Sequence, residues 1–141
     1  MMMEIKINKK TVLAYLGMQE GGIQTELNTR IDATIEKAAA LIRPQYVHGI
    51  FDITKRDEKI VVGNAFEIES YDLSVLLRHS NKALLTAVTI GFDIEREIKM
   101  LQISEIAGAF LLDCCASAAV EDLADAHFKQ LRTAFADNGL N

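Results

Sequence analysis

Residues 106–120 read IAGAFLLDCCASAAV, the longest mostly apolar stretch of the chain. Small side chains dominate its middle, and they allow another backbone or a ligand to come close. The charged segment 121–132 follows it. We therefore predict one long helix over 104–135. Its first half should be central, with a sheet on one face and another helix or a ligand on the other. Its second half should be exposed to solvent. Asp113 and the short length exclude a membrane span, which needs about 20 apolar residues.

The sequence before this segment alternates between helical and strand patterns. In chain order it predicts a helix over 9–16, a helix from 25 to about 43, a strand over 45–53, a hairpin of 60–62 and 65–68, a short helix after Ser70, a strand over 83–90 and a helix after Gly91. No internal repeat or linker-like tract interrupts the chain. The pattern predicts an α+β fold with a single domain over residues 1–141.

Local signals indicate where the helices begin and end. Asn8 can cap the first helix, and Gly17 can supply the left-handed residue that ends it. Pro44 ends the second helix near Arg43, because the residue before a proline avoids the helical conformation. Ser70 can cap the short helix. We expect three leucines of that short helix to face inward, namely Leu73, Leu76 and Leu77.

Alternation and turn residues indicate the strands. Val47, Phe51 and Ile53 have the two-residue spacing that places side chains on one face of a strand. The dipeptide at 63–64, Gly-Asn, can form a tight two-residue turn. Residues 83–90 are apolar enough for a strand buried on both faces.

Composition and charge limit the partners and the compartment. The chain has 15 basic and 20 acidic residues and a net charge of −5. It therefore lacks the basic excess that nucleic-acid binding normally needs. The N-terminal residues show no secretory signal, and we expect no membrane partner. Two cysteines are too few for a disulfide framework, so we expect a cytoplasmic protein.

The adjacent cysteines, Cys114 and Cys115, are expected to be core packing. A disulfide between neighbouring residues needs a distorted backbone that a regular helix does not provide, and free cysteine is among the most buried residue types. Asp113 precedes them, and we expect its carboxylate to be exposed on one face of the helix.

The remaining reactive side chains form no catalytic or metal motif. The three histidines, His48, His79 and His127, lack the spacing of a metal site. The charged residues Glu95, Glu97 and Lys99 are typical of a solvated helix face. An independent enzyme is the least favoured class, because no nucleophile and base are grouped in the sequence.

Four stretches of the chain carry a family likeness through their order. They are VLAYLG at 12–17, ALIRPQYV at 40–47, TAVTIG at 86–91 and LLDCCASAAVEDLAD at 111–125. Together they resemble the activation domain of cobalamin-dependent methionine synthase, in particular its stand-alone relatives. The resemblance covers residues 10 to 130, and the combination is more specific than any one stretch.

The resemblance implies an α+β domain with an antiparallel or mixed sheet and a long alanine-rich C-terminal helix. It also implies binding of S-adenosylmethionine, which such domains present to a cobalamin held by a partner corrinoid protein or domain. Reductive methylation then restores oxidised cobalt, in support of methyl transfer and methionine biosynthesis. An acidic residue on the alanine-rich helix helps to hold the amino group of S-adenosylmethionine in that family, and the matching position is Glu121.

One part of the family pattern does not occur in the chain. The main ligand-binding signature, Arg-x-x-x-Gly-Tyr, follows the alanine-rich helix in the family. Here nine residues follow Arg132 and none is a tyrosine, while Tyr15, Tyr46 and Tyr71 are each preceded by a residue other than glycine. The sequence therefore predicts an incomplete methyl-donor site, in a shortened relative, in a piece of a longer protein, or in a domain that another chain completes.

Two functions remain open at this point. The first is an accessory domain for cobalamin reactivation that binds S-adenosylmethionine, docks on a corrinoid protein, or does both, with no turnover by the isolated chain. The second is a non-catalytic interaction or oligomerisation domain that has kept the fold and lost the methyl-donor site. Self-association would then cover the small-residue surface of 107–119.

Overall fold

The computed structural model describes residues 5–137, which form an α+β fold with a four-stranded antiparallel sheet and a long C-terminal helix. The chain divides into two compact units. Unit 1 contains the chain up to Tyr46 and again from Val88, and unit 2 is Val47–Ala87. The chain passes into unit 2 within one strand and returns within another. Within residues 5–137, no helix combines the length and apolar character needed to cross a membrane.

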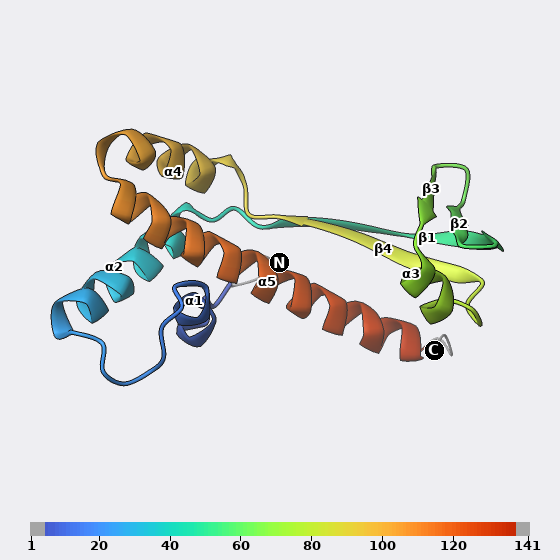
Figure 1. Ribbon diagram of the computed structural model, residues 1–141, viewed down its shortest axis with the longest axis horizontal. Coiled ribbons are helices and arrows are strands. Elements are labelled where there is room, and N and C mark those ends of the chain that lie inside the picture. The colour runs from blue at the N-terminus through green and yellow to red at the C-terminus, as the bar shows by residue number, and fades with distance from the viewer. Residues whose placement is uncertain (1–4, 138–141) are drawn as a thin grey trace. The chain divides into compact units, whose positions relative to one another are not determined.

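Unit 1 is built around its last helix. Its four helices are α1 (Lys9–Tyr15), α2 (Thr25–Leu41), α4 (Phe92–Ser104) and α5 (Ile106–Asp137). Helix α5 packs against the other three, with α4 along one side and α1 and α2 along the other (Figure 1). The long helix predicted over 104–135 is thus confirmed to within two residues at each end. Its neighbours on two sides within unit 1 are helices, whereas a sheet was expected on one of these sides.

Small side chains explain how α5 can pack against three helices at once. One row of its buried residues recurs every three or four positions, as the inner face of a helix requires: Ala109, Leu112, Cys115, Ala119 and Leu123. Alanine and cysteine at this face keep the helix axes close, while Ile31 of α2 and Ile94 of α4 fill the space between them without exposed area.

The predicted helix ends in unit 1 agree closely with the structure. The Asn8 side chain accepts a hydrogen bond from the backbone of Lys10 at 2.9 Å, and Gly17 adopts the left-handed conformation with φ of +70°. Helix α2 ends at Leu41, and Ile42 is already extended two residues before Pro44. These local signals therefore lie where the sequence predicted the helix ends.

Gly91 lies between strand β4 (Lys82–Thr89) and helix α4, at a point where two segments of unit 1 meet. Its φ is +87°, and a Cβ atom there would lie 2.9 Å from the Cβ atom of Arg43. The Arg43 backbone donates a 2.7 Å hydrogen bond to the carbonyl of Ile90. Both the backbone conformation and the close approach require glycine, which accounts for the Gly that ends the TAVTIG stretch.

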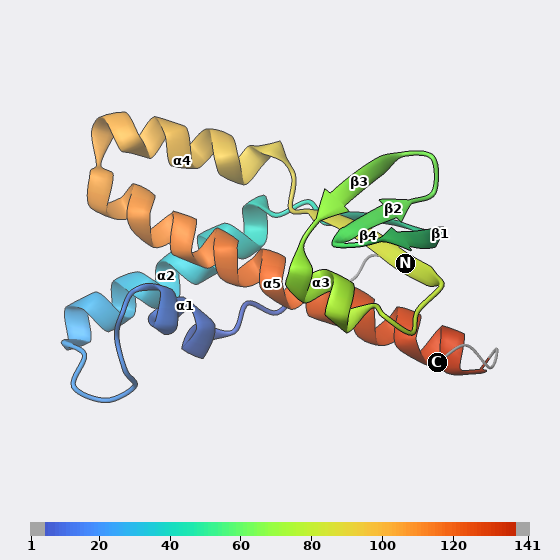
Figure 2. The same ribbon diagram turned by 45° about the vertical axis from the view of Figure 1, so that its right-hand side comes forward.

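Unit 2 contains most of the sheet and one short helix. The strands are β1 (Gln45–Arg56), β2 (Lys59–Val62), β3 (Phe66–Glu69) and β4 (Lys82–Thr89), in the order β3-β2-β1-β4, and the helix is α3 (Tyr71–Leu76). Pairing of Ile53 with Val62 and of Ile60 with Ile68 places apolar side chains on one face. Helix α3 adds its own leucines to this cluster beside the β2–β3 hairpin (Figure 2).

The hairpin lies at the predicted residues, but its turn is longer than the two residues predicted. Val62 pairs with Phe66, so the turn contains three residues, Gly63, Asn64 and Ala65, with Gly63 at a positive φ of +53°. A second hairpin joins β1 to β2 through Asp57, whose φ is +56°. Sequence reasoning ended β1 at Ile53 and missed this turn, because the run of charged residues at 55–59 conceals the strand alternation.

Three expectations about burial in unit 2 were wrong. Strand β4 is an edge strand in which every residue is half-buried or exposed, whereas full burial on both faces belongs to strands covered on two sides. Leu76 is 75% exposed, because it lies off the inward face of α3. That face carries Leu73 and Leu77, and Leu77 is the C-cap of the helix. Val47 is 69% exposed, although Phe51 and Ile53 do face the cluster.

Candidate functional site

Glu121 lies on the side of α5 that faces α1, and the residue is exposed. The Tyr15 hydroxyl, at the last residue of α1, donates a hydrogen bond to this carboxylate at 3.1 Å. The two residues are 106 positions apart in the chain. The structure therefore gives the residue singled out by resemblance a specific polar neighbour that the sequence did not indicate.

An open hollow surrounds this pair. It has a volume of about 450 Å³ and is lined by Lys10, Thr11, Ala14, Tyr15 and Glu121. Ala14 contributes only a methyl group, which leaves space between the two helices. The lining thus combines one anion, one cation and two hydroxyl groups with the methyl group of Ala14, a set suited to a small zwitterionic or cationic group.

The position of α1 against α5 is set by a second carboxylate. Asp122 accepts a hydrogen bond from the backbone N–H of Asn8 at 3.0 Å, at the start of α1. Val12 and Leu13 bury the opposite face of α1 in the core of unit 1. Consecutive acidic residues on α5 therefore contact both ends of α1, Asp122 at its first turn and Glu121 at its last.

Electrostatics keeps Tyr15 in its donating form. The hydrogen bond to Glu121 and the negative charge of that carboxylate both raise the pKa of the Tyr15 hydroxyl above its ordinary value of 10.0. Tyr15 thus remains a neutral donor at physiological pH. Glu121 keeps lone pairs that a ligand ammonium group can use, since an ionised carboxylate accepts several hydrogen bonds.

The cysteine expectation was correct. Cys114 and Cys115 are buried free thiols, 4% and 1% exposed. Burial raises the pKa of Cys115 to about 12 and also raises the pKa of Cys114, so neither forms the reactive thiolate at neutral pH. Asp113 is exposed, as expected.

The three histidines lie in different environments. His48 and His79 are exposed in unit 2, whereas His127 on α5 is 2% exposed, with its ring stacked at a tilt on Tyr46 at 4.0 Å between centroids. Burial of His127 was not predicted, although its four-residue spacing from Leu123 and Leu131 was a visible signal. Among residues 5–137, no group of three or more His, Cys, Asp or Glu side chains is arranged to hold a metal ion.

Comparison with known proteins leaves the chain unassigned to a family. No protein-family model matches it, and no curated protein matches it. The likeness of the four quoted stretches therefore contributes only to a proposal.

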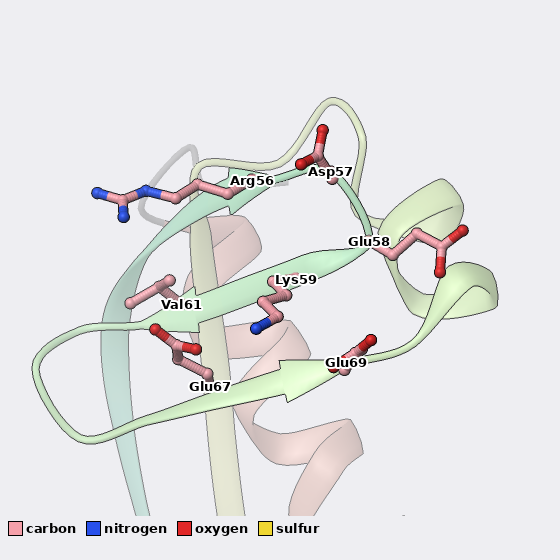
Figure 3. A pocket seen from close by; sticks show the side chains of 7 residues that line it. All are labelled: Arg56, Asp57, Glu58, Lys59, Val61, Glu67 and Glu69. Carbon is pink, nitrogen blue, oxygen red and sulfur yellow. The ribbon is translucent and has the colours of Figure 1, made fainter.

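Two further hollows differ in character from the one at Glu121. On the outer face of the unit 2 hairpin, Lys59 of β2 lies between Glu67 and Glu69 of β3 (Figure 3). This mixture of charges is typical of a solvated sheet face with cross-strand partners. The other hollow, on α4, is lined by both apolar and charged residues, namely Phe92, Glu95, Arg96, Lys99, Met100 and Ile103.

Proposed function

We propose that this chain is an accessory domain for the reductive reactivation of cobalamin, related to the activation domain of methionine synthase. It binds S-adenosylmethionine at the hollow between α1 and α5 and docks on a corrinoid protein. The single observation that supports this proposal best is the exposed Glu121 carboxylate, held by Tyr15 at the edge of that hollow. The four ordered stretches quoted above agree with it.

The chemistry of the hollow suits the amino-acid end of the ligand. The ammonium group of S-adenosylmethionine can donate a charge-assisted hydrogen bond to Glu121, stronger than a neutral one. Lys10 lines the same hollow and offers a positive charge to the ligand carboxylate. S-Adenosylmethionine would supply the methyl group and leave as S-adenosylhomocysteine, and the cobalt held by the corrinoid protein would accept that methyl group after one-electron reduction by a separate electron-donor protein.

The contacts that this chain provides are limited to one end of the ligand. None of its three tyrosines follows a glycine, so the family's Arg-x-x-x-Gly-Tyr cradle is not among its 141 residues. We therefore expect binding that depends strongly on Glu121, because few other contacts can compensate for its loss. Turnover by the isolated chain is not expected.

Calorimetric titration with S-adenosylmethionine tests the site directly. Replacing Glu121 by Gln keeps the shape and removes the charge, so we expect affinity to fall by about tenfold or more, the effect of one charge-assisted hydrogen bond. The matched control is Asp113→Asn, an exposed carboxylate on the same helix that does not line the hollow, and its affinity should equal that of the unmodified protein. 5′-Methylthioadenosine, which lacks the whole amino-acid end of the ligand, should show no measurable binding to the unmodified protein or to either variant.

A pull-down tests the second half of the proposal. The purified chain should retain a cobalamin-loaded corrinoid protein encoded near its gene. Absence of binding in both the titration and the pull-down would refute the proposal. Retention of the corrinoid protein without ligand binding would indicate a docking module that lacks the donor site.

A second candidate function is favoured by a separate observation. Helix α4 exposes large apolar side chains on the face opposite its core contacts, with Phe92 86% exposed and Ile103 91% exposed. Such a face is typical of protein interaction surfaces. It supports a non-catalytic interaction or oligomerisation domain.

A further inference from the structure

Helix α4 has two apolar faces, and only one of them is used inside unit 1. Ile94, Ile98 and Leu101 pack into the core. Phe92, Met100 and Ile103, by contrast, are 86%, 60% and 91% exposed, and all three line one hollow. At 100° per residue, Phe92 and Ile103 lie within about 20° of each other on the side opposite the core stripe. We call this set, together with Glu95, Arg96 and Lys99, the outer face of α4.

The charges of this outer face nearly cancel. Arg96 donates a 2.9 Å hydrogen bond to Asp93 of its own helix, which satisfies that cation. Glu95 and Lys99 then remain as one anion and one cation, four residues apart and both exposed. A surface without net charge gives no attraction to a strongly acidic or basic partner, and nucleic acid or an anionic membrane is therefore a poor fit.

The arrangement is complementary to itself. If two copies of α4 pack antiparallel about a twofold axis near residue 97, Glu95 of each copy faces Lys99 of the other. The same axis brings Phe92 of each copy beside Ile103 of the other. An isologous contact of this kind repeats every favourable pair twice. From the charge pattern and the exposed apolar residues, we infer that the outer face of α4 binds a second copy of this chain, in an antiparallel helix pair.

The area involved predicts a weak dimer. Three large apolar side chains exposed to this degree offer roughly 400–500 Å² per copy, given about 150–250 Å² for a large side chain. Two copies together, with the stems of the charged residues, bury about 1,000 Å², near the lower limit for a specific interface. The dimer should therefore form in the micromolar range of concentration. This inference deepens the second candidate function and does not depend on the ligand.

Sedimentation velocity over protein concentrations from about 1 µM to about 500 µM tests the dimer. We expect the unmodified chain to pass from monomer to dimer within this range, and Ile103→Asp to remain monomeric throughout. The matched control is Phe128→Asp, which changes an apolar residue of similar size, 54% exposed, on α5, and it should dimerise like the unmodified chain. A monomer at every concentration, or a dimer that Ile103→Asp leaves unchanged, overturns the inference.

Charge reversal tests the antiparallel pairing itself. E95K places a lysine opposite Lys99 of the other copy, and K99E places two glutamates opposite each other. Each single variant should dimerise about tenfold more weakly, because two attractive pairs become repulsive. The double variant E95K/K99E restores both pairs and should recover the original dimerisation constant. Failure of the double variant to recover would contradict the proposed geometry.

A disulfide provides an independent geometric test. The double variant Phe92→Cys with Ile103→Cys places its two thiols about 16 Å apart along one helix, too far to bond within a copy. Oxidation should therefore yield a covalent dimer, and the native thiols will contribute little because both are buried with raised pKa values. A failure to cross-link faster than Phe128→Cys alone would count against the pairing. S-Adenosylmethionine binding by Ile103→Asp should be unaffected, which separates this inference from the proposed ligand site.

Discussion

At the residue scale, the pair of Tyr15 and Glu121 is the most informative contact in the chain. It joins α1 to α5 through a hydrogen bond of 3.1 Å. Glu121 could be singled out from sequence only through the family resemblance, because an exposed glutamate at the start of a charged segment is otherwise ordinary. Tyr15 could not be connected to it, since no sequence periodicity links residues 106 positions apart.

This pair makes a prediction about pH. In Glu121→Gln the Tyr15 hydroxyl loses both the anion and its charged acceptor, so its pKa should fall toward the ordinary value of about 10. Tyrosinate absorbance followed through an alkaline titration measures this shift, and Tyr15→Phe identifies which part of the curve belongs to Tyr15. Identical titration curves for the unmodified chain and Glu121→Gln would contradict the observed contact.

The sign of the linked stability effect follows from the same shift. The pKa of Tyr15 is higher in the folded chain than in the unfolded one. Its hydrogen bond therefore contributes stability that is fully present below pH of about 10 and is lost as the pH rises through the raised pKa.

At the element scale, α5 supports the whole of unit 1. Leu112 has no exposed area and contacts the core from the middle of the helix. Leu112→Ala should lower the free energy of unfolding by about 2–5 kcal/mol, the cost of a lost side chain plus the cavity left behind. Ile106→Ala, at a residue 77% exposed on the same helix, should cost under about 0.5 kcal/mol. Chemical denaturation of both variants measures the difference, and similar losses would argue against a central α5.

Most elements could be predicted because their signals are local. The caps at Asn8 and Ser70 and the left-handed residue at Gly17 are each decided by a few neighbouring residues. The turn at Asp57 was missed because an aspartate with positive φ has no distinctive signal within a charged run. The exposure of β4 was missed because apolar composition does not reveal whether a strand lies in the middle or at the edge of a sheet.

At the scale of the whole molecule, the chain is organised as two units of unequal size. Unit 2, Val47–Ala87, is inserted between the two parts of unit 1. Sequence composition gave no boundary there, because the chain crosses between the units inside β1 and β4 and not in a Gly- or Ser-rich linker. The α1–α5 hollow lies entirely within unit 1. The proposed ligand site therefore depends on the helical unit alone.

The most direct test of the proposed function is to identify the residues at which S-adenosylmethionine binds. Titration of the isotope-labelled protein, followed by amide chemical shifts, should change the signals of Ala14, Tyr15 and Glu121 most, and the changes should saturate and be absent in Glu121→Gln. Signals of unit 2 should remain nearly constant. A spectrum unchanged by the ligand, or changes centred on the hairpin of unit 2, would contradict a methyl-donor site at the α1–α5 hollow.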